Sequence, residues 1–437
     1  MKRTFGRLGA LLAVRAYLQC TTRRHRASAS RGCDAFAEAA LSLLRCAGPA
    51  GVSFRLLNTD RRTRSHVIMS ISSADTQSIV VLGAYGLAGR AIVERLVRRT
   101  HYAVVAAGRN RVKLREQLAR LDSSRVRECV MDADDGAAVR AACTGSAFVI
   151  NAVGPYAKNG ASIARSVIEA GCGYLDCANE QSHYRRLRAL DELARRLGVP
   201  MITAAGLIPG LSSLLIAHAL QALPEADAVE VCFAQRRHAY AETGLGSIMG
   251  GILEAGGSPT AWSSGAPATV RMGTSTRIAA FPAPFGTLRL IEVPTIDDLV
   301  IPQRFRLREM HTWFYMGDLP TYLLGMIRVL QPGRRPWAYR LVETSIRRIN
   351  DRETARAIAA DVGPEVLLTV TAANSEFTRT HRLLFCDGAV PTACLPVHIV
   401  DRHLRGEPVG TGLLTPLDIV APETVFDLTG DFRIDTP

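Results

Sequence analysis

The chain has 437 residues, of which 48% are hydrophobic and 21% are charged, a balance typical of a globular protein with two or three domains. Its net charge of +13 would suit a nucleic-acid partner, but residues 1–68 contain 13 basic and only three acidic residues. The rest of the chain therefore carries only +3. A protein that binds a phosphate backbone keeps its basic patch on the folded domain, so this distribution argues against nucleic-acid binding.

Residues 1–77 form a basic leader without a sustained helical or strand period. Three interpretations stay open: a targeting segment, a disordered basic arm, or residues upstream of a true start at Met69. We favour the third, because a short polar stretch and then a strand pattern follow Met69 directly. The apolar run Leu8–Val14 is too short to cross a membrane. The ten cysteines show no metal-ligand spacing, so we expect buried thiols in a reducing, cytoplasmic compartment and no metal.

From Ser78 to Ala205, apolar strand patterns alternate with amphipathic helix patterns. Strands are predicted at 79–82, 103–107, 126–130, 147–151, 173–177 and 199–203, and helices at 88–97, 111–121, 135–143, 162–170 and 185–197. This alternation predicts βαβ units and an α/β fold with a Rossmann-type, doubly wound parallel sheet. The stretch between Arg196 and Glu225 has no charge, but its prolines and glycines favour a buried strand, turn and helix over a membrane span.

The first predicted strand runs into a glycine-rich turn with the pattern G-x-x-G-x-x-G, formed by Gly83, Gly86 and Gly89. Such glycines allow a tight turn, a close approach of the backbone to a pyrophosphate, and close packing of the next helix on the strand. A glycine-rich turn without a ligand is the alternative. The residues predicted to bind a dinucleotide here are Gly83, Ala84, Tyr85, Gly86, Leu87 and Gly89.

The end of the second strand distinguishes NAD from NADP. An NAD site usually has an acidic residue there, but this chain has Arg109 and Asn110, with Arg111 and Lys113 close behind. A guanidinium can hold a ribose 2′-phosphate through paired hydrogen bonds. We therefore predict NADP(H), with Arg109 and Asn110 in the site; a solvated basic helix start is the alternative.

The fourth and fifth strands end in polar residues at the carboxyl edge of the sheet, where doubly wound folds bind ligands. Asn151 and Gly154 are predicted to meet the pyrophosphate or the nicotinamide ribose, unless the segment is a plain turn. Tyr156, Asp176 and Glu180 are the predicted catalytic residues, because proton transfer needs such groups near the carbon that accepts hydride. The alternative for Glu180 is an acid that opens a helix.

Beyond residue 205 the patterns are weaker. They predict a strand at 229–234, irregular β structure over 258–310, a hairpin at 365–372 and 378–386, a helix at 392–404 and a turn at 410–416. The glycine-rich segment 244–257 would line a substrate cleft or, as we slightly favour, form a small-residue packing helix. The apolar, aromatic segment 313–330 is core by default, with a pocket cap or contact with a membrane surface as alternatives.

Several motifs in this order resemble the saccharopine dehydrogenase-like family. They are the glycine turn, the Ala-Gly-Arg-Asn end of the second strand, the loop 151–156, the segment 169–176 and the segment 206–211. The chain departs from the family's Thr-Gly-Glu by having Ala178, Asn179 and Glu180. The resemblance implies an NADP-binding Rossmann domain, a second domain with a mixed sheet, and a C-terminal helix that returns to the first domain.

The family is chemically broad, and it includes saccharopine dehydrogenases as well as partners of lipid synthesis that resemble enoyl reductases. No arginine pair suited to a dicarboxylate is evident here, so the resemblance favours a reductase acting on an apolar or polyketide-like substrate.

Four segments are expected: the leader 1–77, the NADP-binding Rossmann domain 78–205, an α+β domain for substrate binding and dimerisation at 206–390, and a C-terminal segment 391–437 that packs back on the Rossmann domain. The leading hypothesis is an NADP(H)-dependent oxidoreductase that transfers hydride to a small molecule and forms a homodimer. The alternatives are a non-catalytic NADP(H) sensor or scaffold, and a lipid-handling protein at a membrane surface.

Overall fold

The structure is a computed structural model, and the residues that it describes begin at Gln77. They are 77–121, 123–235, 259–270, 274–315, 366–386 and 388–429, together with short pieces between 325 and 348 and residues 433–435. The leader up to residue 76, the glycine-rich segment 244–257 and residues 316–324 of the aromatic segment lie outside the described residues.

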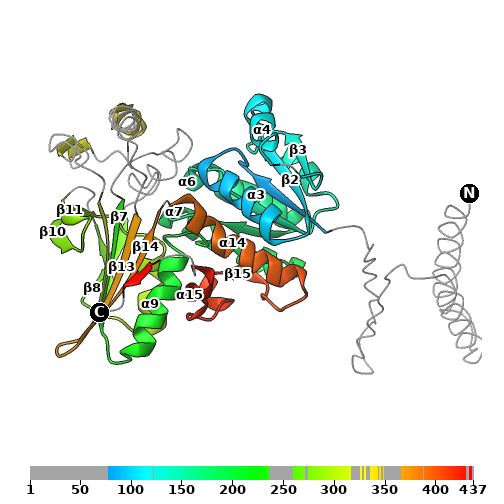
Figure 1. Ribbon diagram of the computed structural model, residues 1–437. Coiled ribbons are helices and arrows are strands. Elements are labelled where there is room, and N and C mark those ends of the chain that lie inside the picture. Colours follow the sequence, from blue (N-terminus) through cyan, green and yellow to red (C-terminus); the bar gives the residue numbers. More distant parts are fainter. Residues whose placement is uncertain are drawn as a thin grey trace, which may run out of the picture. The chain divides into compact units, whose positions relative to one another are not determined.

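The first sheet has seven parallel strands in the order β15-β6-β5-β4-β1-β2-β3 (Figure 1). The strands are β1 (Ser78–Leu82), β2 (Ala103–Gly108), β3 (Val126–Val130), β4 (Phe148–Asn151), β5 (Gly173–Asp176), β6 (Pro200–Ile202) and β15 (Gly412–Leu414). The order changes direction between β1 and β4, and this is the switch point of a doubly wound fold. The predicted fold class is confirmed. The seventh strand, β15, was not predicted, because the sequence indicated only a turn there.

Helices connect these strands. They are α3 (Leu87–Arg99), α4 (Arg111–Leu118), α5 (Gly136–Cys143), α6 (Tyr156–Glu169), α7 (Gln181–Arg188), α8 (Asp191–Leu197) and α9 (Leu211–Ala222). Local caps explain two of the starts: the side chain of Asn110 accepts a hydrogen bond from the Lys113 amide, and that of Asp135 accepts from Ala137 and Ala138. The prediction of a single helix over 185–197 is wrong. The chain turns at Leu190, whose side chain is buried, and a second helix begins after it.

The second sheet is mixed. Its main path runs β10-β11-β12-β7-β13-β14-β16; off this path, β8 pairs with β12 and β9 pairs with β8. The strands are β7 (Ala228–Gln235), β8 (Thr260–Ser263), β9 (Ala266–Thr269), β10 (Thr276–Phe281), β11 (Gly286–Glu292), β12 (Glu309–Tyr315), β13 (Val366–Ala373), β14 (Thr378–Phe385) and β16 (Arg433–Asp435). The predicted hairpin is confirmed as β13 and β14, which pair antiparallel from Val366 opposite Phe385 to Ala373 opposite Thr378. The prediction of irregular β structure over 258–310 is only partly right, since the helix α11 (Asp297–Phe305) lies within that range.

The helix α14 (Ala389–Leu404) returns from the second sheet and packs against α3, and the two lie side by side in Figure 1. The Tyr102 hydroxyl donates to Asp401 Oδ1 at 3.0 Å, which ties the helix to the first domain. The remaining described elements of this segment are β15, the 3-10 helix η2 (Pro416–Asp418), the short helix α15 (Thr424–Leu428) and β16. The C-terminal segment therefore contributes to both sheets.

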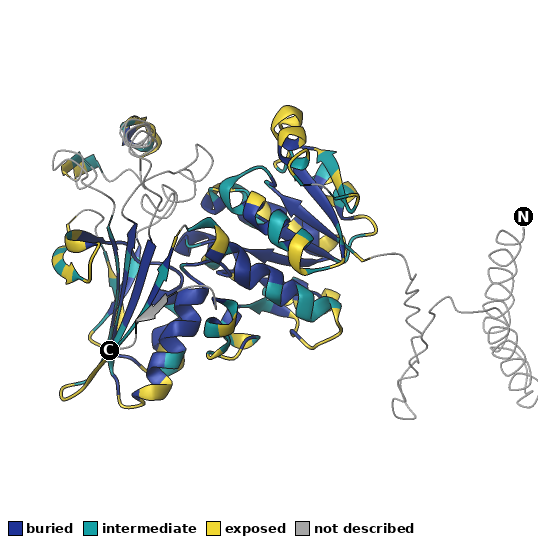
Figure 2. Ribbon diagram, viewed as in Figure 1, coloured by how far each residue is buried: buried dark blue, intermediate teal, exposed yellow. Residues whose placement is uncertain are grey.

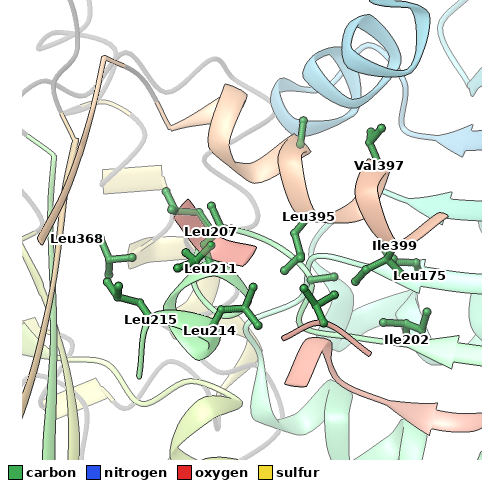
Figure 3. Packing of buried hydrophobic residues seen from close by; sticks show 14 of the residues in the cluster. Leu175, Ile202, Leu207, Leu211, Leu214, Leu215, Leu368, Leu395, Val397 and Ile399 are labelled. Atoms are coloured by element: carbon green, nitrogen blue, oxygen red, sulfur yellow. The ribbon is translucent and has the colours of Figure 1, made fainter. Parts of the chain in front are cut away.

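One apolar core extends from the first sheet to the second, and buried residues of both domains share it (Figure 2). Ile399 of α14 lies near Leu175 of β5, and Leu215 of α9 lies near Leu368 of β13 (Figure 3). Each fully buried aliphatic side chain of this size contributes about 1.5–3 kcal/mol relative to exposure. The shared core therefore holds the carboxyl edge of the first sheet facing the second domain.

The uncharged stretch after Arg196 forms β6, a loop and α9, as predicted. None of the helices that the structure describes is long and apolar enough to cross a membrane.

Candidate functional site

The glycine turn joins β1 to α3, and its backbone leaves no room for a side chain at two of its glycines. Gly83 has φ +72°, and a Cβ there would lie 2.8 Å from the Ala152 carbonyl oxygen. A Cβ at Gly89 would lie 2.2 Å from the Gly83 carbonyl oxygen, so α3 packs directly on the turn. Gly86 is the N-cap of α3, and no side chain caps this helix. Its first amide groups and the positive end of its dipole remain available to an anionic ligand.

Beside this turn, the end of β2 presents a cation. Arg109 is exposed, and among the described residues its guanidinium has no hydrogen-bond or ion-pair partner. The nearby Glu128 is instead held by Arg115, at 3.1 Å. The ring of Tyr85 lies against Gly108, next to Arg109. An unpaired guanidinium beside an uncapped helix N-terminus suits a phosphorylated ligand.

A cleft of about 1060 Å³ opens over the carboxyl ends of the first sheet. The turn after β1 and the residues Arg109–Lys113 form one end of it, together with residues 131–134 after β3. The loop 152–155, the first turn of α6 with Tyr156, Lys158 and Asn159, and residues 206–208 also line the cleft. The second domain and the start of α14 complete it with Phe233, Gln235, Phe314, Gly388 and Thr392.

Most residues predicted to bind the cofactor line this cleft. They are Gly83, Tyr85, Gly86, Leu87, Arg109, Asn110 and Gly154. Ala84, Gly89 and Asn151 are instead buried behind its wall. Their part in the site is to shape the wall, as Gly89 does by letting α3 approach the turn.

Asn151 is buried at the end of β4 and organises the loop that follows. Its Oδ1 accepts from the Val153 amide at 3.0 Å, and its Nδ2 donates to the Tyr174 hydroxyl at 3.0 Å. Its backbone oxygen accepts from the Tyr156 hydroxyl at 3.1 Å. The loop 152–156 is thus fixed at both ends.

Tyr156 is the one predicted catalytic residue that lines the cleft. Burial, followed by the neighbouring charges of Cys177, Asp176 and Glu180, raises the pKa of its phenol well above the ordinary value. The hydroxyl therefore stays protonated, in agreement with the hydrogen bond that it donates.

Asp176 lies at the end of β5 and is fully buried behind the cleft. Its carboxylate accepts four hydrogen bonds, from the Tyr174 hydroxyl (2.8 Å), His183 Nε2 (2.7 Å), the Ala178 amide (3.1 Å) and the Thr203 hydroxyl (2.6 Å). Burial alone would raise the pKa of Asp176, but His183 and the other donors hold it below the ordinary value. An ionised, fully bonded carboxylate of this kind suits a structural task.

Glu180 is also fully buried. Its Oε1 accepts from the Tyr156 amide at 2.9 Å, and its Oε2 accepts from the Asn179 amide at 3.2 Å. Neither Asp176 nor Glu180 is among the residues that line the cleft. A catalytic role for the two acids stays a prediction, and their placement favours a role in positioning the loops.

Sequence reasoning missed two groups of cleft residues. Residues 131–134 and 206–208 follow strand ends at the same edge of the sheet, and that topological signal could have found them. Phe233, Gln235 and Phe314 come from β7 and β12 of the second sheet, whose place opposite the first sheet no local pattern indicates.

The match to a family model falls on the first domain. Residues 79–203 match the family model described as the saccharopine dehydrogenase NADP binding domain. A lipid droplet localized protein of Caenorhabditis elegans is 30% identical over 138 residues, which are 29% of this chain and 32% of the relative. A probable mitochondrial saccharopine dehydrogenase-like oxidoreductase of Arabidopsis thaliana is 28% identical over 141 residues, 29% of this chain and 31% of the relative. The matched region thus spans about a third of the length of these curated relatives.

Solved structures resemble the chain more broadly but more weakly. The DAP dehydrogenase of C. glutamicum is 13% identical with a TM-score of 0.40, and the likeness covers 80% of this chain and 95% of that one. GenD2 from gentamicin A biosynthesis is 14% identical with a TM-score of 0.40, over 85% of this chain and 100% of that one. Likenesses at this level carry no argument about substrate or activity.

Proposed function

This chain carries an NADP-binding domain of the saccharopine dehydrogenase-like family, as its motifs predict, and on that premise we propose that the protein is an NADP(H)-dependent oxidoreductase. The cleft between the carboxyl edge of the first sheet and the second domain is its active site. NADPH, when bound, supplies a hydride to an apolar small-molecule substrate.

One observation carries this proposal: the N-terminus of α3, which no side chain caps, and the guanidinium of Arg109, which has no partner in the part of the chain that the structure describes, open into the same cleft. Helix N-termini bind phosphates through amide groups and the helix dipole, and Arg109 can hold the 2′-phosphate. Only glycine fits at positions 83 and 89 of the turn, because a Cβ at Gly83 or Gly89 would clash with the backbone. These residues fit the group that the family implies.

The far end of the cleft favours an apolar substrate. Leu207, Ile208, Phe233 and Phe314 form much of that end of the wall. Ligand pockets have volumes of about 300–1,000 Å³, so a cleft at the top of this range suits a dinucleotide together with a small substrate. Tyr156 borders this end, and we place it near the reacting centre, where its protonated hydroxyl keeps the loop 152–156 in place.

Fluorescence titration with NADPH and NADH tests the cofactor assignment. Arg109→Ala should weaken NADPH binding about tenfold or more, because a charge-assisted hydrogen bond to the phosphate is lost, and it should leave NADH binding unchanged. Arg98→Ala is the matched control, because Arg98 is an exposed cation on α3 that does not line the cleft. An Arg109→Ala protein that binds NADPH as tightly as the wild type would sink the assignment.

A substrate screen, followed by the absorbance of the reduced nicotinamide, separates an enzyme from a sensor. Turnover of an apolar carbonyl or enoyl compound supports the oxidoreductase. Tight NADPH binding without oxidation by any compound of the panel would favour the non-catalytic sensor or scaffold.

A second candidate function is docking on a phospholipid surface. Residues 336–342 are helical, and Trp337 and Leu341 are 58% and 46% exposed while Ala338 and Val342 are buried. Arg335 and Arg340 are exposed on the same segment, and exposed tryptophan with arginine is typical of interfacial helices. The C. elegans relative is named for lipid droplets, although the matched region is confined to about a third of its length.

Co-sedimentation with vesicles of phosphatidylcholine and phosphatidylserine tests the second candidate. Trp337→Ala should reduce the bound fraction, while Phe377→Ala, which removes an exposed aromatic ring elsewhere, should not. Equal binding of the vesicles by the wild type and Trp337→Ala would refute a role for this helix. The cytoplasmic location of the protein stays a prediction.

A further inference from the structure

Two loops border the half of the cleft that lies beyond the switch point. The loop 152–156 follows β4, and residues 177–180 follow β5. In a doubly wound fold each half of the sheet binds one mononucleotide, with the switch point between them. Arg109 belongs to the β1-β2-β3 half, so these two loops belong to the half that receives the nicotinamide.

We infer that Glu180, a residue of the second loop, is a positioning residue that fastens the first loop to the second for the nicotinamide half of the cofactor. One carboxylate oxygen binds the amide of Tyr156 and the other binds the amide of Asn179, at 2.9 and 3.2 Å. Tyr156 and Asn179 both line the cleft, whereas Glu180 lies behind them with no exposed surface. Glu180 therefore acts on the cleft through the two residues that it holds.

The clasp is rigid because the elements behind it are fixed. Asp176 binds the amide of Ala178 and the imidazole of His183, which joins the start of the second loop to α7. The His183 ring packs against α6 at Gly160, where a Cβ would approach Cε1 at 2.5 Å. The helices α6 and α7 thus pack closely at Gly160, and the side chain of Glu180, the N-cap of α7, binds the amide of the first residue of α6. A carboxylate is also favourable at a helix N-terminus.

An amide cannot replace this carboxylate. Glutamine offers one acceptor oxygen and one NH₂ donor, so Glu180→Gln keeps one of the two hydrogen bonds and sets a donor against the other amide N–H. Aspartate keeps both acceptors but is one methylene shorter, so Glu180→Asp cannot reach the Tyr156 amide of the first loop from its place in the second. Each variant should loosen the link between the two loops on the nicotinamide side and leave the glycine turn and Arg109 as they are.

The inference rests on the proposed function. A ligand that corresponds to only the adenosine half of the cofactor distinguishes an effect on the nicotinamide side from a general loss of binding. Adenosine 2′,5′-bisphosphate has the phosphorylated ribose but no nicotinamide, so its affinity reports the Arg109 half alone. The dissociation constants of NADPH and of this bisphosphate are measured for the wild type, Glu180→Gln and Glu180→Asp. Glu169→Gln is the matched control, because Glu169 is an exposed acid on α6 that pairs only with Arg165 in the described residues.

NADPH should bind about tenfold more weakly to both Glu180 variants, with bisphosphate affinity unchanged within about twofold. Loss of both affinities together, or of neither, would overturn the inference, since a general structural defect affects both halves. If one variant does not fold, the other decides. A wild-type protein that binds neither ligand overturns the proposed function instead.

Discussion

Replacing Gly89 by alanine should abolish NADPH binding out of proportion to its effect on stability. The added Cβ would lie 2.2 Å from the Gly83 carbonyl oxygen and 2.8 Å from its carbon, both backbone atoms that cannot rotate away. The helix α3 must then move off the turn. Overpacking of this kind costs about 1–3 kcal/mol. The same movement separates the turn from the helix amides that would bind the pyrophosphate.

Gly171→Ala is the matched control for this change. Gly171 has φ +76°, and nothing lies within 4 Å of the place where its Cβ would be. It precedes β5, at the amino edge of the sheet, away from the cleft. A Cβ in the left-handed region costs about 1–2 kcal/mol through backbone strain alone. The two variants should therefore lose similar stability by different causes.

Thermal unfolding with and without NADPH separates these causes. A ligand at 100 times its dissociation constant stabilises the native state by about 2.7 kcal/mol, which appears as a rise in melting temperature. The wild type and Gly171→Ala should both show this rise, and Gly89→Ala should show none. A full NADPH-dependent rise in Gly89→Ala would refute the placement of the cofactor on this turn.

Two further predictions concern the joint between the domains. Burial raises the pKa of Asp297 to about 6 and that of Asp298 to about 7, from 3.8. The protonated carboxyls therefore stabilise the folded state in acid, and this contribution to stability is lost as the pH rises through these values. Urea unfolding at about pH 5 and about pH 8 should show the wild type losing stability relative to Asp298→Asn on going to the higher pH; a difference independent of pH would contradict this. Gln181 of α7 exchanges hydrogen bonds with Thr260 at 2.7 and 2.8 Å and donates to the Thr295 carbonyl at 2.8 Å. Gln181→Ala leaves at least one buried polar group without a hydrogen bond, so it should lower the free energy of unfolding by about 1–3 kcal/mol or more. A loss of stability as small as that of Glu169→Gln would exclude a structural role for these bonds.

The first sheet could be predicted from the sequence because its central strands are apolar throughout and helices separate them. β1 and β2 are buried along nearly their whole length, which is the pattern of a parallel sheet covered on both faces. β15 could not be predicted. It has three residues, and its register beside β6 depends on contacts far along the chain, including the Leu413 amide bound to Asp191 at 2.7 Å. α11 was missed because it contains Pro302 and opens with two acids that are buried rather than solvated.

The candidate site was predicted where topology alone decides it. Strand ends in a parallel sheet meet at one edge, so the turn at Gly83, the cation Arg109 and the loop at Gly154 could be placed there from sequence. The direction of a side chain after a strand end is not encoded in that rule. Asp176 and Glu180 were located at the correct edge, but both turn inward, because backbone amides behind the wall offer them hydrogen bonds.

The inward placement of Asp176 and Glu180 also lowers the number of carboxylates that face the cleft. A dinucleotide with a 2′-phosphate is strongly anionic, and free carboxylates facing it would repel it. Asp176 stays ionised because His183, Thr203, Tyr174 and a backbone amide compensate for its burial. Its charge is thus directed into hydrogen bonds behind the wall, while Arg109 and the positive end of α3 face the ligand. Asp176 and Glu180 therefore add no carboxylate to the cleft wall, where the acids among the described lining residues are Asp132 and Asp134.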